Sequence, residues 1–523
     1  MDQAPTQFIP DRFVKTAKED LNLFWATYFN KVTPDGAAST STKKTQRAHL
    51  LDYVQKQDGA GSVWREKDAA TWEEQARLGA GKATCYGLKV RQGDLEAAID
   101  QIIPNEDGSY DLGMIKSMLA PKDYHYMRMA FQKHVLEQSG VKVRSCHFWM
   151  LNPSYGDAEG SPLMVRQNVS GAIQLAEKKL PDLLERMRKA VADPKKAPTD
   201  DYCPALHEPT LPKNHVFKLT QGKKKAQIVY KRGILDLADW PPDIELSPTQ
   251  AVQVNAAKSK SLQVNHHAIE QFLSSLRYPL HFLDFETAAS PVPLYPGVAP
   301  FKSIPFMFAN YKCAEVGAPL THDVFIAEPG KDPRRAMVDN LKKSVEGHGS
   351  IVVFNKTAES GALMALAEEF PEDKEFLLQA NESLVDLYSP FRSYHFHHPD
   401  QAGNSLKSLL GALTGVKYDK LAIREGTAAE EAWIVMHDER DPAKVAATID
   451  ALKTYCCQDA SGMAIVLDFV QKAVKANNSI LQTPALQQSK GMPEIKAPEV
   501  MAARKADLQN LASALERGDI PTF

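Results

Sequence analysis

Residues 278–287 read YPLHFLDFET, and this stretch decides how the second half of the chain is interpreted. Its apolar and aromatic composition predicts a β-strand. Because the side chains of a strand alternate between two faces, Asp284 and Glu286 project from one face and Leu283 and Phe285 from the other. Neighbouring carboxylates repel each other, and their burial is costly unless a cation compensates the charge. The pair therefore indicates either an exposed strand end or a metal-binding strand.

Composition limits the classes of protein to consider. The chain has 523 residues, more than one hydrophobic core usually organises, so we expect two or three domains. With 62 Lys and Arg against 65 Asp and Glu, the formal net charge is −3. Any contact with nucleic acid must therefore come from a local basic surface.

Three absences in the sequence favour a cytoplasmic protein with no membrane association. We find no uncharged apolar run of about 18 residues, the length that a transmembrane helix needs. The start, MDQAPTQFIPDRFVK, has neither the basic beginning nor the apolar centre of a signal peptide. Six cysteines without a CxxC pair suggest neither a disulfide framework nor a zinc knuckle.

The pattern of strands and helices predicts an α/β protein in which a strand-rich first region precedes a second α/β domain. In the first region, strands are expected at 84–94 and 109–119, separated by the turn NEDGS, and a helix follows them. We divide the chain into an N-terminal region, a helical and basic connecting region, a second α/β domain and a polar tail with one closing helix, at residues 1–165, 166–265, 266–475 and 476–523.

Further polar residues follow along the second domain in a fixed order. The stretch VVFNKTAES puts Asn355 at a strand end and Glu359 in the first turn of the next helix. The stretch YCCQDASGM puts Tyr455 and Asp459 four residues apart, on one face of a helix. An ordered DxE, N-x3-acid and Y-x3-D pattern is typical of a two-metal phosphoryl-transfer site. Such a site needs about four carboxylates around two ions about 4 Å apart, and Mg²⁺ or Mn²⁺ favours oxygen ligands.

This order of acids resembles the DEDD exonuclease superfamily, and Y-x3-D resembles its tyrosine-bearing branch. The resemblance implies a ribonuclease-H-like (DnaQ-like) mixed sheet with flanking helices, in which Tyr455 orients the attacking water. Glu359 departs from the pattern, because the superfamily usually has Asp there. The implied ligands of two Mg²⁺ or Mn²⁺ ions are Asp284, Glu286, Glu359 and Asp459.

More closely, the chain resembles an uncharacterised bacterial family, a domain-of-unknown-function group. In that family a RecB-like PD-(D/E)XK nuclease-type region precedes a DEDD-like domain. The resemblance covers most of residues 230–470 and is much weaker before residue 165. The matching stretches are RGILDLADWP, YPLHFLDFET, IPFMFANY, IVVFNKTAES, LVDLYSPF, NSLKSLLGAL and YCCQDASGM.

The resemblance implies a degenerate restriction-endonuclease-like α/β fold for the N-terminal region. A PD-(D/E)XK site needs an Asp on one strand and E-x-K on the next. Lys116 stands at the lysine position, but Met114 takes the glutamate position, and Tyr86 or Gly87 stands where the aspartate should be. Gln132 resembles the family's helix glutamine. The remaining role is either nucleic-acid docking, with Lys116 as a substrate contact, or a structural or protein-binding platform.

Other polar residues of the second domain have more than one interpretation each. Asp386 in LVDLYSPF is an additional ligand, an acid that supports the ligands, or a helix-cap residue, and Asn355 shares the first two roles. Lys407, near a helix start, contacts a substrate phosphate or is solvated. His395 belongs to SYHFHHP, whose three histidines favour a loop near the substrate over a zinc site.

Packing explains the remaining motifs better than chemistry. Phe306 and Phe308 in IPFMFANY fit a strand core better than base stacking. Cys456 and Cys457 are interpreted as packing residues, because adjacent cysteines make poor metal or disulfide pairs.

These observations predict a metal-dependent nuclease, with 3′→5′ exonuclease action on single-stranded DNA or RNA ends as the preferred activity. A structure-selective endonuclease that uses the same metal site is one alternative. A non-catalytic nucleic-acid-binding or scaffold protein is the other, with a protein partner bound by the degenerate N-terminal region. The sequence leaves DNA or RNA preference open, because no residue can be assigned to the 2′-hydroxyl.

Overall fold

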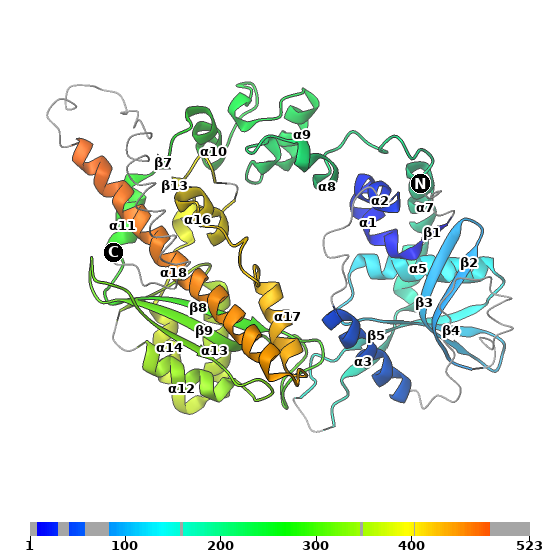
Figure 1. The fold of residues 1–523 in the computed structure, drawn as a ribbon. Helices are drawn as coiled ribbons and strands as arrows, with labels where there is room; N and C mark the ends of the chain where they lie inside the picture. The colour runs from blue at the N-terminus through cyan, green and yellow to red at the C-terminus, as the bar shows by residue number, and fades with distance from the viewer. Residues whose placement is uncertain are drawn as a thin grey trace. The chain divides into compact units, whose positions relative to one another are not determined.

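The computed structural model describes residues 8–29, 41–57, 83–156, 160–345, 349–401 and 403–481 (Figure 1). The chain forms two compact units: unit 1 joins Met1–Thr210 to Ala289–Lys302, and unit 2 joins Leu211–Ala288 to Ser303–Phe523. The expected connecting region at 166–265 is thus shared between the units. The closing helix expected in 476–523 lies outside the described residues. None of the described helices combines the length and the apolar character that crossing a membrane requires.

Unit 1 contains a mixed sheet whose strands follow the order β1-β3-β4-β5-β6, with β2 paired to β3. Strands β2, β3 and β4 are antiparallel neighbours in sequence, whereas β4 and β5 are parallel and are joined through a helix. The strands are Ile9–Pro10 (β1), Cys85–Gln92 (β2), Leu95–Pro104 (β3), Tyr110–Ile115 (β4), Val143–Leu151 (β5) and Met164–Asn168 (β6).

The strand β3 was missed in the sequence, where only two strands were expected between residues 84 and 119. The chain makes a two-residue hairpin turn at Gly93 and Asp94, and Gln92 pairs with Leu95 directly after it. Gly93 has a φ of +58°, a backbone conformation that glycine adopts without steric cost. The signal for a third strand was therefore the turn at Gly93 and Asp94. These two residues were included in the strand expected at 84–94, so the turn was overlooked.

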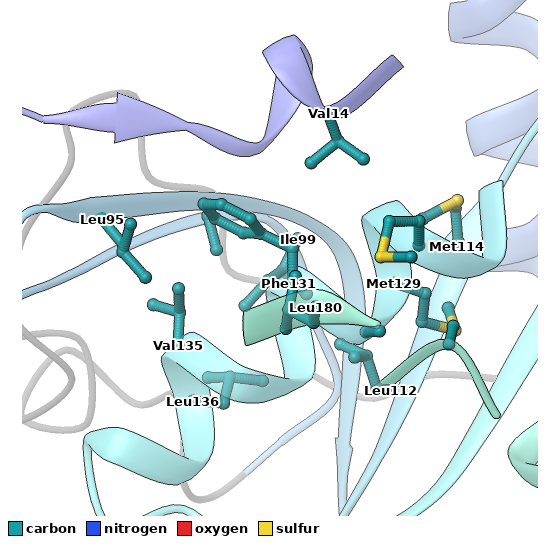
Figure 2. Close-up of a cluster of buried hydrophobic side chains, with 14 of the residues drawn as sticks. Val14, Leu95, Ile99, Leu112, Met114, Met129, Phe131, Val135, Leu136 and Leu180 are labelled. Carbon is teal, nitrogen blue, oxygen red and sulfur yellow. The ribbon is translucent and has the colours of Figure 1, made fainter. Parts of the chain in front are cut away.

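Helices of unit 1 cover the two faces of its sheet with separate cores. On one face, α5 contributes Phe131 and Val135 to a large cluster that includes Ile99 and Leu112 from the sheet (Figure 2). On the other face, Leu50 and Val54 of α3 pack with a smaller cluster of sheet residues. The helices are Val14–Glu19 (α1), Leu21–Tyr28 (α2), Ser41–Gln57 (α3), Asp123–Gln138 (α5), Ser170–Glu177 (α6), Leu180–Ala190 (α7) and Pro204–His207 (α8).

Unit 2 is built on a five-stranded sheet of order β10-β9-β8-β11-β12. Strands β8, β9 and β10 form an antiparallel meander, and β11 and β12 extend the other edge parallel to β8. The strands are Leu280–Ala288 (β8), Ile304–Cys313 (β9), Thr321–Ile326 (β10), Ser350–Val353 (β11) and Leu384–Asp386 (β12). The mixed α/β class expected for this half of the chain is confirmed.

The two faces of this sheet carry different helices, as Figure 1 shows. Leu283 and Phe308 of the sheet pack in one core with α12, α13 and α14. The opposite face, from which Asp284 and Glu286 project, is crossed by α17 and by the long helix α18. These helices are Arg334–Ser344 (α12), Thr357–Glu369 (α13), Lys374–Glu382 (α14), Gly426–Met436 (α17) and Pro442–Leu481 (α18).

A β-bulge separates the two phenylalanines of β9. Glu286 pairs with Met307 but the next residue, Thr287, pairs with Pro305, so Phe306 is the extra residue. A bulge turns the side chain to the other face, and Phe306 stacks on Trp433 of α17 with ring centroids 4.4 Å apart. Phe308 packs in the α12–α14 core instead. Both rings are buried, so the prediction that they belong to the core is confirmed.

A smaller helical layer completes unit 2. It includes a two-stranded sheet of Gln263–Val264 (β7) and Phe396–His397 (β13) and its own apolar cluster around Val216 and Trp240. The remaining described α-helices of unit 2 are Lys223–Lys231 (α9), Pro248–Ser259 (α10), His266–Ser274 (α11), Ser389–Arg392 (α15) and Leu406–Thr414 (α16).

Candidate metal centre

The centre begins on β8, where Asp284 and Glu286 project from the face that α18 covers. Glu286 is 6 % exposed, and Asp284 is half-buried. Asp284 Oδ2 is nevertheless a buried atom, and no hydrogen-bond donor reaches it from the described residues. A buried, unpaired carboxylate oxygen is unfavourable unless a further group binds it.

Glu359 reaches the same place from the first turn of α13. Strand β11 runs parallel to β8, so both chains leave the sheet at the same edge. Asn355 follows β11 with a φ of +69°, and this left-handed residue turns the chain into the helix. Glu359 is only 5 % exposed, and its Oε2 is a second buried carboxylate oxygen without a partner among the described residues.

Asp386, at the end of β12, holds this turn in place. Its Oδ1 accepts hydrogen bonds from the backbone N–H groups of Asn355, at 2.9 Å, and of Tyr388, at 3.0 Å. The side chain of Asn355 is exposed. One oxygen of Asp386 therefore has a structural role, because it binds these two backbone groups. The charge of Asp386 also raises the pKa of Glu359.

The helix α18 supplies the fourth acid. Asp459 is 9 % exposed and accepts hydrogen bonds from the hydroxyl groups of Tyr455, four residues earlier, and of Tyr418. Tyr418 lies in the segment between α16 and α17, and its ring meets that of Tyr455 edge-on, with centroids 6.2 Å apart. Two phenol donors on one carboxylate fix its orientation.

Lys407 is a cation whose charge acts on Glu286 and Asp459. Its Nζ lies over both tyrosine rings, 5.0 Å from the Tyr418 centroid and 5.1 Å from that of Tyr455. The same ammonium group donates a hydrogen bond to the backbone oxygen of Arg424. Lys407 is half-buried, and its contact with a substrate phosphate stays a prediction.

Burial raises the pKa values of the four acids of the centre. Burial and the charge of Asp459 raise the pKa of Glu286 to about 8, although Lys407 opposes the shift. Burial raises the pKa of Glu359 to about 7, and Asp386 adds to it. For Asp284, burial and then the charges of Asp459, Glu286 and Glu359 raise the pKa well above its usual range. Such shifts are expected where carboxylates are arranged for a cation.

The two tyrosines remain protonated donors. Burial, followed by the charge of Asp459, raises the pKa of Tyr418 and that of Tyr455 above the usual range. Burial also raises the pKa of Asp459, while hydrogen bonds from Tyr418 and then Tyr455 lower it. Burial is the larger effect, so the pKa of Asp459 stays above its usual range, and the two hydroxyl groups limit the shift.

The adjacent cysteines of α18 have different surroundings, which the sequence did not indicate. Cys456 is fully buried, and its Sγ donates to the backbone oxygen of Asp284 at 3.5 Å. Its Sγ and one carboxylate oxygen each of Asp284 and Glu286 lie within 4.8 Å of one another. Cys457 instead makes a hydrogen bond with Tyr311 of β9. The interpretation of Cys456 as a packing residue alone was therefore incomplete.

The predicted site residue His395 and its neighbour His397 make contacts of their own. The backbone of His395 accepts a hydrogen bond from Asn265 beside the β7–β13 sheet. His397, from the same SYHFHHP stretch, lines a cavity of about 90 Å³ with Asn214, Gln253 and Tyr394. Within the part of the chain that the structure describes, no histidine joins a group arranged to hold a metal ion.

Lys116 belongs to unit 1, where it forms a buried ion pair with Asp100 of β3. Lys116 Nζ lies 3.0 Å from Asp100 Oδ2, and Arg47 Nη2 lies 2.6 Å from Asp100 Oδ1. The acid that lies beside Lys116 is Asp100 and not a residue at the expected position, Tyr86 or Gly87, because β4 pairs with β3 and not with β2. This acid was missed because strand β3 was missed.

Among the described residues of unit 1, none joins Asp100 in a group arranged to hold a metal ion. The position of a second acid is taken by Met114, whose side chain is fully buried in the core. Gln132 donates hydrogen bonds to Asp11 Oδ2, at 2.6 Å, and to the Ala98 backbone oxygen, at 2.7 Å. The carboxylates there are paired with cations or amide donors, although Gln132 Oε1 is buried without a partner among the described residues.

Comparison with known proteins agrees with part of the sequence interpretation. Residues 281–405 match the family model described as Domain of unknown function (DUF2779). The expected resemblance to an uncharacterised family is thereby confirmed over this segment. The segment includes Asp284, Glu286 and Glu359 and ends before Lys407 and α18. No curated protein and no solved structure gives a significant match.

Proposed function

We propose that unit 2 is a metal-dependent nuclease domain that hydrolyses phosphodiester bonds. The observation that carries the proposal is the convergence of four acids from β8, α13 and α18, two of which have buried oxygens without a partner among the described residues. A structural role would leave such oxygens paired, as Asp386 is. Two divalent cations would satisfy them.

The strand order of the sheet supports the same proposal. An antiparallel three-stranded meander extended by two parallel strands, β10-β9-β8-β11-β12, is the arrangement expected for a ribonuclease-H-like domain. The first acids lie on its central strand and the last on a helix that crosses it. We therefore propose that fold for unit 2 and interpret Glu359 as the third acid of a DEDD-like set.

The residues present fit Mg²⁺ or Mn²⁺. Asp284, Glu286, Glu359 and Asp459 offer carboxylate oxygens, which these hard cations prefer. When bound, a pair of such ions activates water and neutralises the charge that develops on a phosphodiester. Their charge would also bring the raised pKa values of Glu286 and Glu359 back toward ordinary values, so that all four acids act as carboxylates.

The remaining residues of the centre have distinct duties in this proposal. Tyr455 and Tyr418 hold the Asp459 carboxylate in one orientation, and the Tyr455 hydroxyl is the group placed to orient an attacking water. Lys407 is the positive group available to a substrate phosphate. Asp386 and Asn355 fix the turn that delivers Glu359.

Unit 1 would support this activity without catalysing it. The order β2-β3-β4-α5-β5, with Asp100 on β3 and Lys116 directly after the neighbouring β4, is what a PD-(D/E)XK-like fold predicts. Met114 in place of an acid, together with Arg47 on Asp100, replaces metal binding by an internal ion pair. We propose nucleic-acid docking or protein binding for this unit.

The test uses single-stranded DNA and RNA labelled at the 3′ or at the 5′ end, with Mn²⁺ and the full chain. We expect mononucleotides to be released from the 3′ end, and Asp284→Ala/Asp459→Ala to be inactive. Asp450→Ala, an exposed acid on the same helix α18, is the matched control and should act as wild type. Internal cuts in a circular single strand would identify an endonuclease instead.

The contrary result is equally specific. If wild type and double variant are equally inert on every substrate, and Mn²⁺ leaves the melting temperature unchanged, the centre does not bind the ions and the catalytic proposal fails. Unit 2 would then be a binding or scaffold domain. An occupied site must raise the melting temperature, because an ion that binds only the folded state stabilises it.

A further inference from the structure

Cys456 gives the carboxylate centre a sulfur atom. Its Sγ, one oxygen of Asp284 and one of Glu286 lie within 4.8 Å of one another. The thiol is fully buried and is held by its hydrogen bond to the Asp284 backbone oxygen at 3.5 Å. Small side-chain rotations would bring all three atoms to within bonding distance of one cation placed between them.

An independent observation indicates that this place takes a ligand. Glu359 is only 5 % exposed, and its Oε2 has no partner among the described residues. Its negative charge acts on Asp284 and raises the pKa of that acid. Asp284 Oδ2 is unpaired in the same way. Cys456 also makes a hydrogen bond with the Asp284 side chain, so the oxygen that speaks for a cation independently of the cysteine is that of Glu359.

The donor atoms decide which cation. Mg²⁺ takes oxygen ligands and gains little from sulfur, whereas Zn²⁺ binds thiolate and carboxylate together in four-coordinate sites. Two carboxylates and one thiolate leave the fourth position to water. Zn²⁺ binding would displace the thiol proton to solvent, and the ion would take Asp284 and Glu286 away from a catalytic pair.

We propose that Cys456, Asp284 and Glu286 form a binding site for a thiophilic divalent cation, Zn²⁺, which competes with Mg²⁺ or Mn²⁺ and inhibits the centre. The inhibitory consequence rests on the proposed nuclease function, whereas the ion site itself does not. Cys457 provides a built-in comparison, because it is the next residue on α18 but interacts with Tyr311.

The test is a titration of the full, reduced chain with Cd²⁺, followed by the ultraviolet thiolate-to-cadmium charge-transfer absorption. We expect the band to saturate at one Cd²⁺ per chain. Zn²⁺ should abolish the band by displacement, and Mg²⁺ in large excess should not. Cys457→Ser, the matched control, should retain the band.

Two variants make the proposal falsifiable. Cys456→Ser should lose the band and bind Cd²⁺ about 100-fold more weakly, because the soft ligand is gone. Asp284→Asn keeps the thiol and should weaken binding about tenfold, which gives a second test if the serine variant folds poorly by circular dichroism. The proposal is overturned if wild type shows no band, or if Cys456→Ser keeps it at full strength.

The two proposals fail separately. A cadmium band that depends on Cys456, in a chain without nuclease activity in Mn²⁺, would support the ion site and reject the function. Mn²⁺-dependent cleavage by a chain that shows no band would reject the ion site and leave the function standing. In an active chain, Zn²⁺ should inhibit wild type and Cys457→Ser equally.

Discussion

The hydroxyl group of Tyr418 donates a hydrogen bond to Oδ1 of Asp459, a residue 41 positions later in the chain. Tyr455 donates to the same carboxylate from one turn earlier on α18. Only the second of these donors was visible in the sequence as part of a Y-x3-D motif. The pair explains how an acid that is 9 % exposed stays oriented toward β8.

Replacing either tyrosine by phenylalanine should impair the proposed nuclease through Asp459. We expect Tyr418→Phe and Tyr455→Phe each to lower kcat about tenfold or more, and the double variant to lose less than the product, because both donors serve one carboxylate. Loss of a donor raises the pKa of Asp459, so the acid limb of the pH–rate profile should move to higher pH. Fully multiplicative losses with an unshifted limb would show that the hydroxyls act independently of Asp459.

The stability of the metal-free protein should decrease as pH rises. Glu286 and Glu359 have folded-state pKa values of about 8 and about 7, above their usual 4.5. An acid with a raised pKa binds more protons when folded, so stability is lost between about pH 4.5 and pH 8. Thermal melting in chelator at pH 5 and pH 8 measures this loss, and Mn²⁺ should raise the melting temperature more at pH 8.

Glu359→Gln tests the same charge directly. The neutral amide should stabilise metal-free unit 2 by about 1–3 kcal/mol at pH 8 and have little effect at pH 5, because it removes a buried charge. Glu368→Gln, an exposed glutamate of the same helix, should leave the melting temperature unchanged. A lower melting temperature for Glu359→Gln at pH 8 would mean that the carboxylate is already compensated within the protein.

In unit 1, Asp100→Asn should destabilise the fold in a pH-dependent way. Burial alone would raise the pKa of Asp100, but Lys116 and then Arg47 lower it from 3.8 to about 2. This difference corresponds to about 2 kcal/mol, which is present above pH 3.8 and is lost as pH falls through about 2. The wild-type advantage in melting temperature should therefore shrink between pH 5 and pH 2, and a constant difference would refute the ion-pair explanation.

Asn355 separates a backbone role from a ligand role. Its φ of +69° makes Asn355→Ala costly by about 1 kcal/mol, whereas Asn355→Gly should be nearly neutral in thermal melting. Both variants should keep Mn²⁺ binding if the residue serves only the turn. If the glycine variant melts normally but loses Mn²⁺ binding, the side-chain amide contributes to the centre, as the sequence allowed.

Local sequence determined much of unit 2. Alternating side chains in YPLHFLDFET put Asp284 and Glu286 on one face and Leu283 and Phe285 on the other, and helical spacing put Tyr455 and Asp459 on one face of α18. Both predictions depend only on the repeat of a strand or a helix, which neighbouring residues set. The order of acids along the chain was likewise readable without a structure.

Tertiary structure decided everything that joins distant segments. Tyr418 meets Asp459, Cys456 meets Asp284 and Asp100 meets Lys116 because sheet pairing and helix packing bring their elements together, and no short-range pattern encodes those pairings. The β-bulge turns the side chain of Phe306 to the other face of the sheet. The tight turn at Gly93 begins a strand that the local pattern did not predict. The sequence thus determined which groups were available, whereas the folded chain decided which of their oxygens and sulfurs are buried together and which remain without a partner among the described residues.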